Sequence, residues 1–144
     1  MLVQQILNSK PSQEVQTIAS SASVSDATGI LSSKRIGALV VTDDGVRVTG
    51  MFSERDVVRE IGRRGVGCMS DKVADLMTRD IITCEKGDTA DAVLHKMTDG
   101  RFRHLPVIED GRLIGLISIG DVVNARLSEM AMENQALEGM IKGF

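Results

Sequence analysis

Two short segments of the chain carry a serine and an aspartate at the same spacing. Ser53 and Asp56 form one pair, Ser118 and Asp121 form the other, and each pair follows a glycine and two apolar residues. A serine that begins a helix and an acid one turn later can form a capping box, which satisfies free backbone N–H groups. The same groups also suit a nucleotide, because a helix N-terminus and a hydroxyl attract phosphate while a carboxylate accepts ribose hydroxyls.

The surroundings of these motifs are duplicated as well. Residues 36–58 and 102–123 are two copies of one pattern, a strand, a glycine-containing turn, a strand and a helix. Such a unit usually cannot bury its apolar face alone, and half of a 144-residue chain makes a marginal domain. We therefore expect one module of two pseudo-symmetric units, residues 1–70 and 71–144, with function in the cleft between them.

Each unit is expected to fold as β-α-β-β-α, which makes the chain α+β. In the first copy we expect strands at 17–19, 38–42 and 47–52 and helices at 24–31 and 53–63. In the second copy we expect strands at 81–84, 104–108 and 113–117, helices at 89–97 and from 118, and a connecting helical turn at 73–77. Gly45 and Gly111 supply positive φ in the two turns. The inner faces of two helices are expected to carry Val57, Val58 and Ile61, and Ala92, Val93 and Met97.

The last helix is expected to continue to about residue 141, beyond its counterpart in the first copy. A stripe with heptad-like spacing runs along it, namely Val123, Leu127, Met130, Asn134, Leu137 and Ile141. This stripe either lies on the core of the protein itself or forms a contact between subunits.

Basic residues distinguish the two copies. Arg101, Arg103 and His104 precede a strand of the second copy that contains Pro106, and Pro favours the edge of a sheet. Arg103 could hold a phosphate there, or the segment could be a solvated basic turn. The first copy has Gly37 and Ala38 at the matching positions and carries Arg55 beside Asp56 instead. The two halves are therefore not equivalent.

Composition excludes several classes of function. The net charge of −3 gives no basic field for nucleic acid or an anionic membrane, and the chain has no Trp or Tyr for base stacking. No apolar run is long enough to span a bilayer, and the first residues do not form a secretory signal. Cys68 and Cys84 are expected to be free thiols of a cytoplasmic protein. His95 and His104 lack further metal ligands, and His104 is the one candidate proton donor, so no catalytic constellation is predicted.

Together these residues resemble the cystathionine-β-synthase (CBS) domain family. The resemblance rests on the strand 105–108, the turn 109–111, the return strand 113–117 and the Ser118–Asp121 motif, with a weaker copy ahead of them. It covers roughly residues 15–127 and points in particular to small stand-alone bacterial CBS-pair proteins. It implies a tandem pair, often dimerised into a disc, that binds AMP, ATP or NAD(H) in the clefts between units.

The resemblance also assigns residues to two sites. One site would be lined by Thr83, Phe102, Arg103, His104, Pro106, Ser118 and Asp121. The other would be lined by Ile18, Ile36, Gly37, Ala38, Ser53, Arg55 and Asp56. The first copy departs from the family pattern, because Gly37 and Ala38 replace an Arg–His pair and residues 19–22 lack the acidic lead-in of residues 85–88.

The expected function is a regulatory adenine-nucleotide sensor that is not an enzyme and has no catalytic cofactor. Its ligand would be AMP, or else ATP or NAD(H), and its partners a second copy of the chain and an unidentified regulated protein. Two alternatives remain open: a structural dimerisation module whose Ser and Asp only cap helices, and an NADH-linked redox protein that uses His104.

Overall fold

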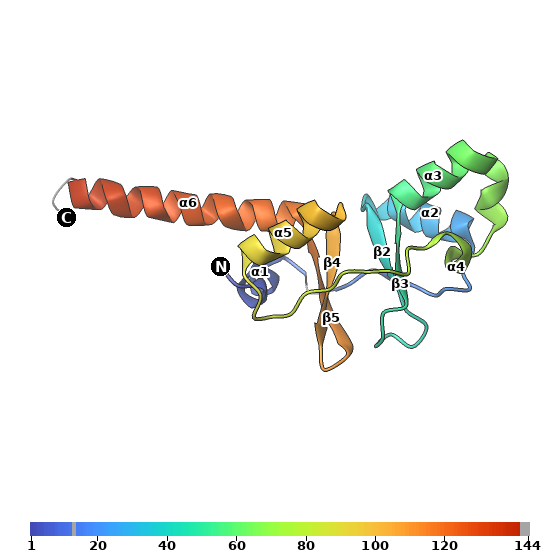
Figure 1. Ribbon diagram of the computed structural model, residues 1–144, viewed down its shortest axis with the longest axis horizontal. Helices are drawn as coiled ribbons and strands as arrows, with labels where there is room; N and C mark the ends of the chain where they lie inside the picture. The colour runs from blue at the N-terminus through green and yellow to red at the C-terminus, as the bar shows by residue number, and fades with distance from the viewer. Residues whose placement is uncertain (13, 142–144) are drawn as a thin grey trace. The chain divides into compact units, whose positions relative to one another are not determined.

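The computed structural model describes residues 1–12 and 14–141 and has a mixed α+β architecture (Figure 1). Its elements are α1 (Val3–Ser9), β1 (Thr17–Ile18), α2 (Val24–Lys34), β2 (Ala38–Val41), β3 (Gly50–Ser53), α3 (Glu54–Arg64), η1 (Val66–Ser70), α4 (Val73–Leu76), α5 (Ala90–Gly100), β4 (His104–Glu109), β5 (Arg112–Ser118) and α6 (Ile119–Ile141). The expected elements are present in the expected order except for one strand, and two elements that were not expected, α1 and η1, are added. Residues 81–84 do not form a strand, and Cys84 makes a single parallel bridge to Val107 instead.

The described residues pack as two compact units. The first-copy unit comprises residues 14–81 and 108–114, and the second-copy unit comprises residues 1–12, 82–107 and 115–141. The N-terminal segment therefore packs with the elements of the second copy. The expected boundary between residues 70 and 71 separates the two copies of the sequence repeat, and it stays a prediction.

The first-copy unit is built on a three-stranded sheet. β1 pairs with β2 in parallel, and β2 pairs with β3 antiparallel, so that Ala38 lies opposite Ser53. All four residues of β2 are buried, as its continuous apolar run predicts. Helix α2 begins after Ser23, whose hydroxyl accepts a hydrogen bond from the N–H of Asp26 at 3.0 Å.

The return strand is shorter than expected. It begins at Gly50 rather than at residue 47, because Oδ1 of Asp44 accepts the N–H groups of Val46 and Arg47, both at 2.8 Å, and holds these residues in a loop. Gly50 is required by close packing, since a Cβ there would lie 2.8 Å from the carbonyl oxygen of Thr78.

The expected inner face of α3 was partly wrong. Val57 is buried, but Val58 is 69% exposed and Ile61 is 36% exposed. The positions that share the buried face with Val57 are Asp56 and Glu60. These charged side chains can occupy the buried face because Arg59 pairs with Asp56 and Arg64 pairs with Glu60. The ion pairs therefore decide which face of this helix is buried.

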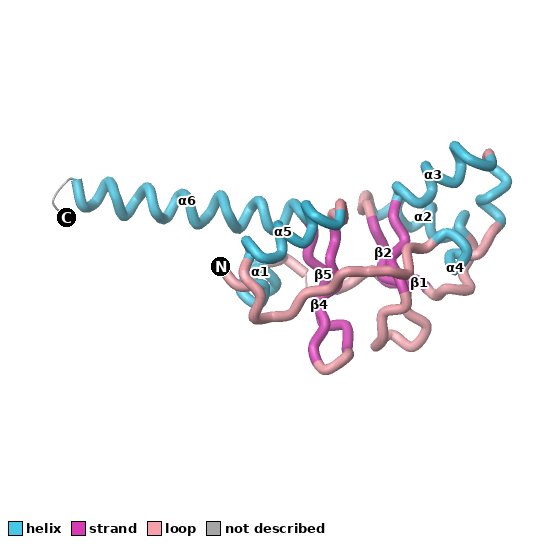
Figure 2. The backbone as a smooth tube through the Cα atoms, in the orientation of Figure 1, coloured by secondary structure: helices cyan, strands magenta, loops and turns pink. Residues whose placement is uncertain are grey.

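Residues 104–107 and 115–118 of the second-copy unit and residues 108–114 of the first-copy unit together form the β4–β5 hairpin (Figure 2). Its turn passes through Asp110 and Gly111, which both have positive φ, at 52° and 76°. Along β4, the carbonyl of Pro106 accepts the N–H of Cys84 at 3.0 Å, a contact that needs no donor on the proline. In α5, Val93 and Met97 are buried as expected.

Ala92, which was expected on the same inner face of α5, is exposed, and Ala90 is buried in its place. The buried face of α5 thus runs through residues 90, 93 and 97, which recur at intervals of three and four residues, whereas Ala92 lies between these positions on the helix surface.

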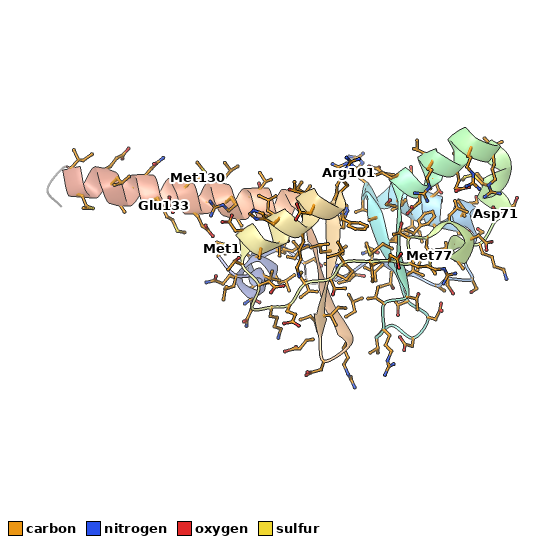
Figure 3. The ribbon with its side chains drawn as sticks, in the orientation of Figure 1. Met1, Asp71, Met77, Arg101, Met130 and Glu133 are labelled. Atoms are coloured by element: carbon orange, nitrogen blue, oxygen red, sulfur yellow. The ribbon has the colours of Figure 1, made fainter. Side chains whose placement is uncertain are left out.

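The long helix α6 is covered only over its first turns among the described residues. Val122 and Ala125 are buried, and α6 contacts α5 and α1. The heptad-spaced residues Val123, Leu127, Met130, Leu137 and Ile141 are 45–85% exposed, so the stripe does not lie on the core of its own unit. Figure 3 shows Met130 and Glu133 on the part of α6 that extends past α1 and α5. None of the described helices combines the length and apolar character needed to cross a membrane.

Candidate functional site

The Ser118–Asp121 motif lies where β5 passes into α6 and forms a capping box. The N–H of Ser118 donates to Oδ2 of Asp121 at 2.9 Å, and the N–H of Asp121 donates to Oγ of Ser118 at 3.1 Å. These two bonds satisfy donors at the start of the helix, as the simpler interpretation of the motif requires.

Part of the hydrogen-bonding capacity of this motif is unused. Among the described residues, none donates a hydrogen bond to Oδ1 of Asp121, and none accepts the hydroxyl proton of Ser118. The Asp121 side chain is 21% exposed. Between the two residues, a Cβ on Gly120 would stand in ordinary van der Waals contact with Oγ of Ser118, at 3.6 Å. The motif thus presents a hydroxyl donor and a carboxylate acceptor about one helical turn apart.

A cation that the sequence analysis missed also lies at this motif. Nζ of Lys10 is 3.1 Å from Oδ2 of Asp121 and donates to the carbonyl oxygen of Leu116 at 2.9 Å. Lys10 follows α1, more than one hundred residues before Asp121 in the sequence. No local pattern signals such a contact, which depends on the packing of α1 in the second-copy unit.

Other predicted residues of the second copy surround the start of α6. The carbonyl of Arg103 accepts the N–H of Ile119 at 2.9 Å, which places Arg103 directly at the helix N-terminus. Arg103 is exposed, and the neighbouring Phe102 and His104 are half-buried. The structure thus brings Arg103, Ser118 and Asp121 together.

Thr83 directly precedes Cys84, and the N–H of Cys84 donates a hydrogen bond to the carbonyl of Pro106. The carbonyl of Thr83 accepts a hydrogen bond from Nζ of Lys96 at 3.0 Å, which ties this segment to α5. Thr83 therefore lies beside β4, near the strand with which it was predicted to act.

The equivalent carboxylate of the first copy is fully engaged. Oδ2 of Asp56 accepts the N–H and the hydroxyl of Ser53 at 2.9 and 3.3 Å. Oδ1 of Asp56 accepts Nη2 of Arg59 at 2.9 Å and the hydroxyl of Thr78 at 3.1 Å. The Asp56 side chain is only 3% exposed. This carboxylate joins β3, α3 and the segment after α4, which is a structural role.

The backbone at the first motif nevertheless matches the second. The carbonyl of Gly37 accepts the N–H of Glu54 at 3.0 Å, as that of Arg103 does for Ile119. Ile36 and Ala38 flank Gly37 at the start of α3, and Arg55 is exposed on that helix. Ile18 pairs with Val41 across β1 and β2, and its side chain belongs to the hydrophobic core.

A second charged cluster lies on α3 away from the motif. Glu60 accepts Nε of Arg64 at 2.8 Å, and Nη2 of Arg64 lies 2.7 Å from Asp71. The hydrogen bond from Arg64 lowers the pKa of Glu60 below its ordinary value, and the charges of Arg63, Arg64 and Arg59 act in the same direction. These pairs hold α3 against the segment that follows η1.

Two other kinds of chemistry find no support among the described residues. No group of three or more His, Cys, Asp or Glu side chains is placed to hold a metal ion in that part of the chain. Cys68 and Cys84 are free and buried, and burial raises the pKa of the Cys84 thiol to about 12, which disfavours the reactive thiolate.

Comparison with known proteins identifies the class. The family model of the CBS domain matches residues 3–63 and again residues 73–128. The chain therefore belongs to the CBS domain family and is a tandem CBS pair. CBS pairs are typically regulatory modules that commonly bind adenosine-containing ligands.

Individual relatives agree with this assignment. The mitochondrial CBS domain-containing protein CBSX3 of Arabidopsis thaliana is 40% identical over 124 residues, which cover 83% of this chain and 60% of that protein. The CBS-domain protein ATU1752 of Agrobacterium tumefaciens is 42% identical, with a TM-score of 0.83 and coverage of 88% of this chain and 99% of that one. The chain thus spans less than two thirds of its curated plant relative.

A third relative carries information about ligands. The CBS domain pair of protein MJ0100 was solved in complex with 5′-methylthioadenosine and S-adenosyl-L-methionine. It is 25% identical to this chain, with a TM-score of 0.76 and coverage of 87% of this chain and 98% of that one.

Proposed function

We propose that this chain is a regulatory sensor of an adenine nucleotide, which binds at the Ser118–Asp121 motif of the second copy. The observation that carries the proposal is the unused pair of groups at the start of α6, the hydroxyl of Ser118 and Oδ1 of Asp121. Ser118 and the N-terminus of α6 would hold the phosphate, and Asp121 would accept the ribose hydroxyls. Thr83 and the residues from Phe102 to Pro106 would surround the base and the phosphate.

AMP is the proposed ligand, with ATP and NAD(H) as alternatives. The adenosine ligands of the MJ0100 pair support the adenine part of this proposal. Binding would act on a regulated partner protein by favouring one conformation or assembly state of the module, in proportion to the difference in affinity between states. The unpaired thiols of Cys68 and Cys84 are consistent with the expected cytoplasmic location, which remains a prediction.

The first-copy site stays a prediction with less support. A ligand that used Asp56 there would have to displace Arg59 or Thr78 from Oδ1, because both oxygens are already engaged. We therefore propose that nucleotide binding in this chain is unequal, with the second copy as the stronger site.

Isothermal titration with AMP, ATP and NADH tests the proposal. We expect at least one of them to bind, and we expect Asp121→Asn to weaken that binding at least tenfold. The matched control is Asp110→Asn, because Asp110 lies in the β4–β5 turn at a positive φ that Asn tolerates. No binding of any of the three ligands near physiological concentration would overturn the nucleotide proposal.

A second candidate function, a dimerisation module, is favoured by the exposed stripe on α6. Its spacing of three and four residues places Leu127, Met130 and Leu137 on one seam, with Asn134 in the middle. Asparagine carries both a donor and an acceptor, so the residue that best satisfies it within an apolar seam is Asn134 of a second copy. We propose that α6 contributes to a homodimer, which is compatible with nucleotide binding.

The mass of the particle in solution, measured by light scattering, tests this contact. A chain that ends after Leu127 and a Leu137→Glu variant are both expected to lose the dimer. Gln135→Glu is the control, since it adds the same charge to an exposed position of α6 outside the stripe. An unchanged mass for both the shortened chain and Leu137→Glu would count against the contact.

A further inference from the structure

The position of Lys10 is determined by the docking of α1. Val3, Ile6 and Leu7 of this helix are buried in the second-copy unit. The N-terminal ammonium of Met1 pairs with Glu129 on α6, and Lys10, at the other end of α1, pairs with Asp121 on the same helix. Both ends of the segment are thus attached to α6. The ammonium of Lys10 is therefore held at the start of α6 by the packing of a whole helix.

The contacts of Lys10 leave it able to bind a further group. Its ammonium has three N–H donors. One is directed to the carbonyl of Leu116, and Oδ2 of Asp121 lies 3.1 Å from the nitrogen. No other described residue pairs with Nζ, and the Lys10 side chain is 28% exposed. A cation with spare donor capacity thus lies beside the proposed nucleotide site.

The arrangement at Asp121 differs from that at Asp56 in a way that affects ligands. In the first copy, Arg59 occupies Oδ1 of the aspartate, opposite the capping bond on Oδ2. In the second copy, Lys10 lies on the same oxygen that caps the helix, Oδ2, and leaves Oδ1 open. Lys10 therefore neutralises the charge of Asp121 and still leaves Oδ1 able to accept a hydrogen bond. Because the Lys10–Asp121 pair is neutral overall, it does not cancel the partial positive charge at the N-terminus of α6.

We infer that Lys10 sets the charge preference of the Ser118–Asp121 site and makes it select adenine ligands that carry a 5′-phosphate. This inference rests on the proposed function and specifies its ligand class. With Asp121 neutralised, an anionic phosphate one turn from the ribose gains the attraction of Lys10 and of the helix N-terminus. Uncharged adenosine and 5′-methylthioadenosine gain neither, and the sulfonium of S-adenosyl-L-methionine is repelled. The site should thus differ in preference from the MJ0100 pair, which is known in complex with the latter two ligands.

Titration calorimetry with AMP, adenosine and S-adenosyl-L-methionine on the full chain tests this inference. The wild type is expected to bind AMP at least tenfold more tightly than adenosine and to bind S-adenosyl-L-methionine most weakly. Lys10→Met keeps an unbranched apolar stem as far as Cε and removes the ammonium group, and it should reduce the ratio of AMP to adenosine affinity about tenfold, mainly through AMP. Lys10→Arg should keep the ratio near that of the wild type.

Lys34→Met provides the control, because Lys34 is exposed at the end of α2 in the first-copy unit. Thermal unfolding of each variant checks that α1 remains docked. If AMP and adenosine bind and Lys10→Met leaves their affinity ratio unchanged, or weakens both equally, the inference is overturned while the proposed function stands. If none of AMP, ATP and NADH binds to the wild type, the proposed function fails and the inference fails with it.

Discussion

Asp56 and Asp121 occupy equivalent positions in the two copies, yet the first carboxylate is 3% exposed and the second is 21% exposed. Asp56 accepts bonds on both oxygens from Ser53, Arg59 and Thr78. Oδ1 of Asp121 accepts no hydrogen bond from any residue that the structure describes. Duplication has thus produced one carboxylate that stabilises its unit and one that is available to a ligand.

The first prediction concerns the unequal effect of the same substitution on stability. Asp56→Asn should lower the free energy of unfolding by about 2–3 kcal/mol, because it disturbs a buried carboxylate with several charged or polar donors. Asp121→Asn should lower it by about 1 kcal/mol, the typical effect of a weakened helix cap. Urea unfolding at pH 7 measures both, with Asp110→Asn as the control. An equal loss for Asp56→Asn and Asp121→Asn would contradict the structural difference between the two aspartates.

The second prediction concerns the glycine at the start of β3. Gly50→Ala should lower the free energy of unfolding by about 1–3 kcal/mol, because the new Cβ would lie 2.8 Å from the backbone oxygen of Thr78 and 2.9 Å from Sδ of Met77. Gly62→Ala is the matched control in α3, where nothing lies within 4 Å, and it should leave stability unchanged or raise it by up to about 1 kcal/mol. Similar values for the two variants would show that β3 does not pack against Thr78 in solution.

The third prediction concerns pH. The pKa of Glu60 is lowered in the folded chain, chiefly by the hydrogen bond from Arg64. The stabilisation from this carboxylate is therefore fully present above its unfolded pKa, about 4.3, and is lost as the pH falls through the lower folded value. The urea midpoint of the wild type should exceed that of Glu60→Gln by a constant amount from pH 7 to about pH 5, and the difference should shrink below about pH 4.

Glu138→Gln is the control for this pH series. Glu138 is exposed on α6 and forms no ion pair with any described residue. Its substitution should leave the midpoint close to that of the wild type at every pH. A difference between wild type and Glu60→Gln that grows as the pH falls would contradict the assigned role of the Arg64 bond.

The fourth prediction concerns the thiol of Cys84. Its pKa is raised to about 12 by burial, so only about one molecule in ten thousand carries the thiolate at pH 8. In a Cys68→Ala background, the reaction of Cys84 with a disulfide reagent at pH 8 should be very slow in the folded protein and fast in 6 M guanidinium chloride. Fast reaction under native conditions would show that the segment around Cys84 opens readily.

Much of the fold could be predicted from local patterns. The apolar run of β2, the start of α2 at Val24 and the positive φ of Gly45 depend on residues near one another in the sequence, and each was confirmed. The repeat itself indicated the CBS pair, which the family match confirmed. Periodicity failed on α3, where Val58 and Ile61 are exposed, because arginine partners on the same helix allow Asp56 and Glu60 to be buried instead.

The sequence by itself determined the two copies, their strand–turn–strand–helix order and the Ser–x–x–Asp motif at each junction, since these follow from short-range spacing and turn chemistry. Only the tertiary structure decided how the two motifs differ. Thr78 and Lys10 reach the two aspartates from segments that are distant in the chain, and their positions depend on how β3 and α1 pack. Because hydrogen-bond partners of a carboxylate are set by packing across such distances, an identical motif became a structural link in one unit and a candidate ligand site in the other.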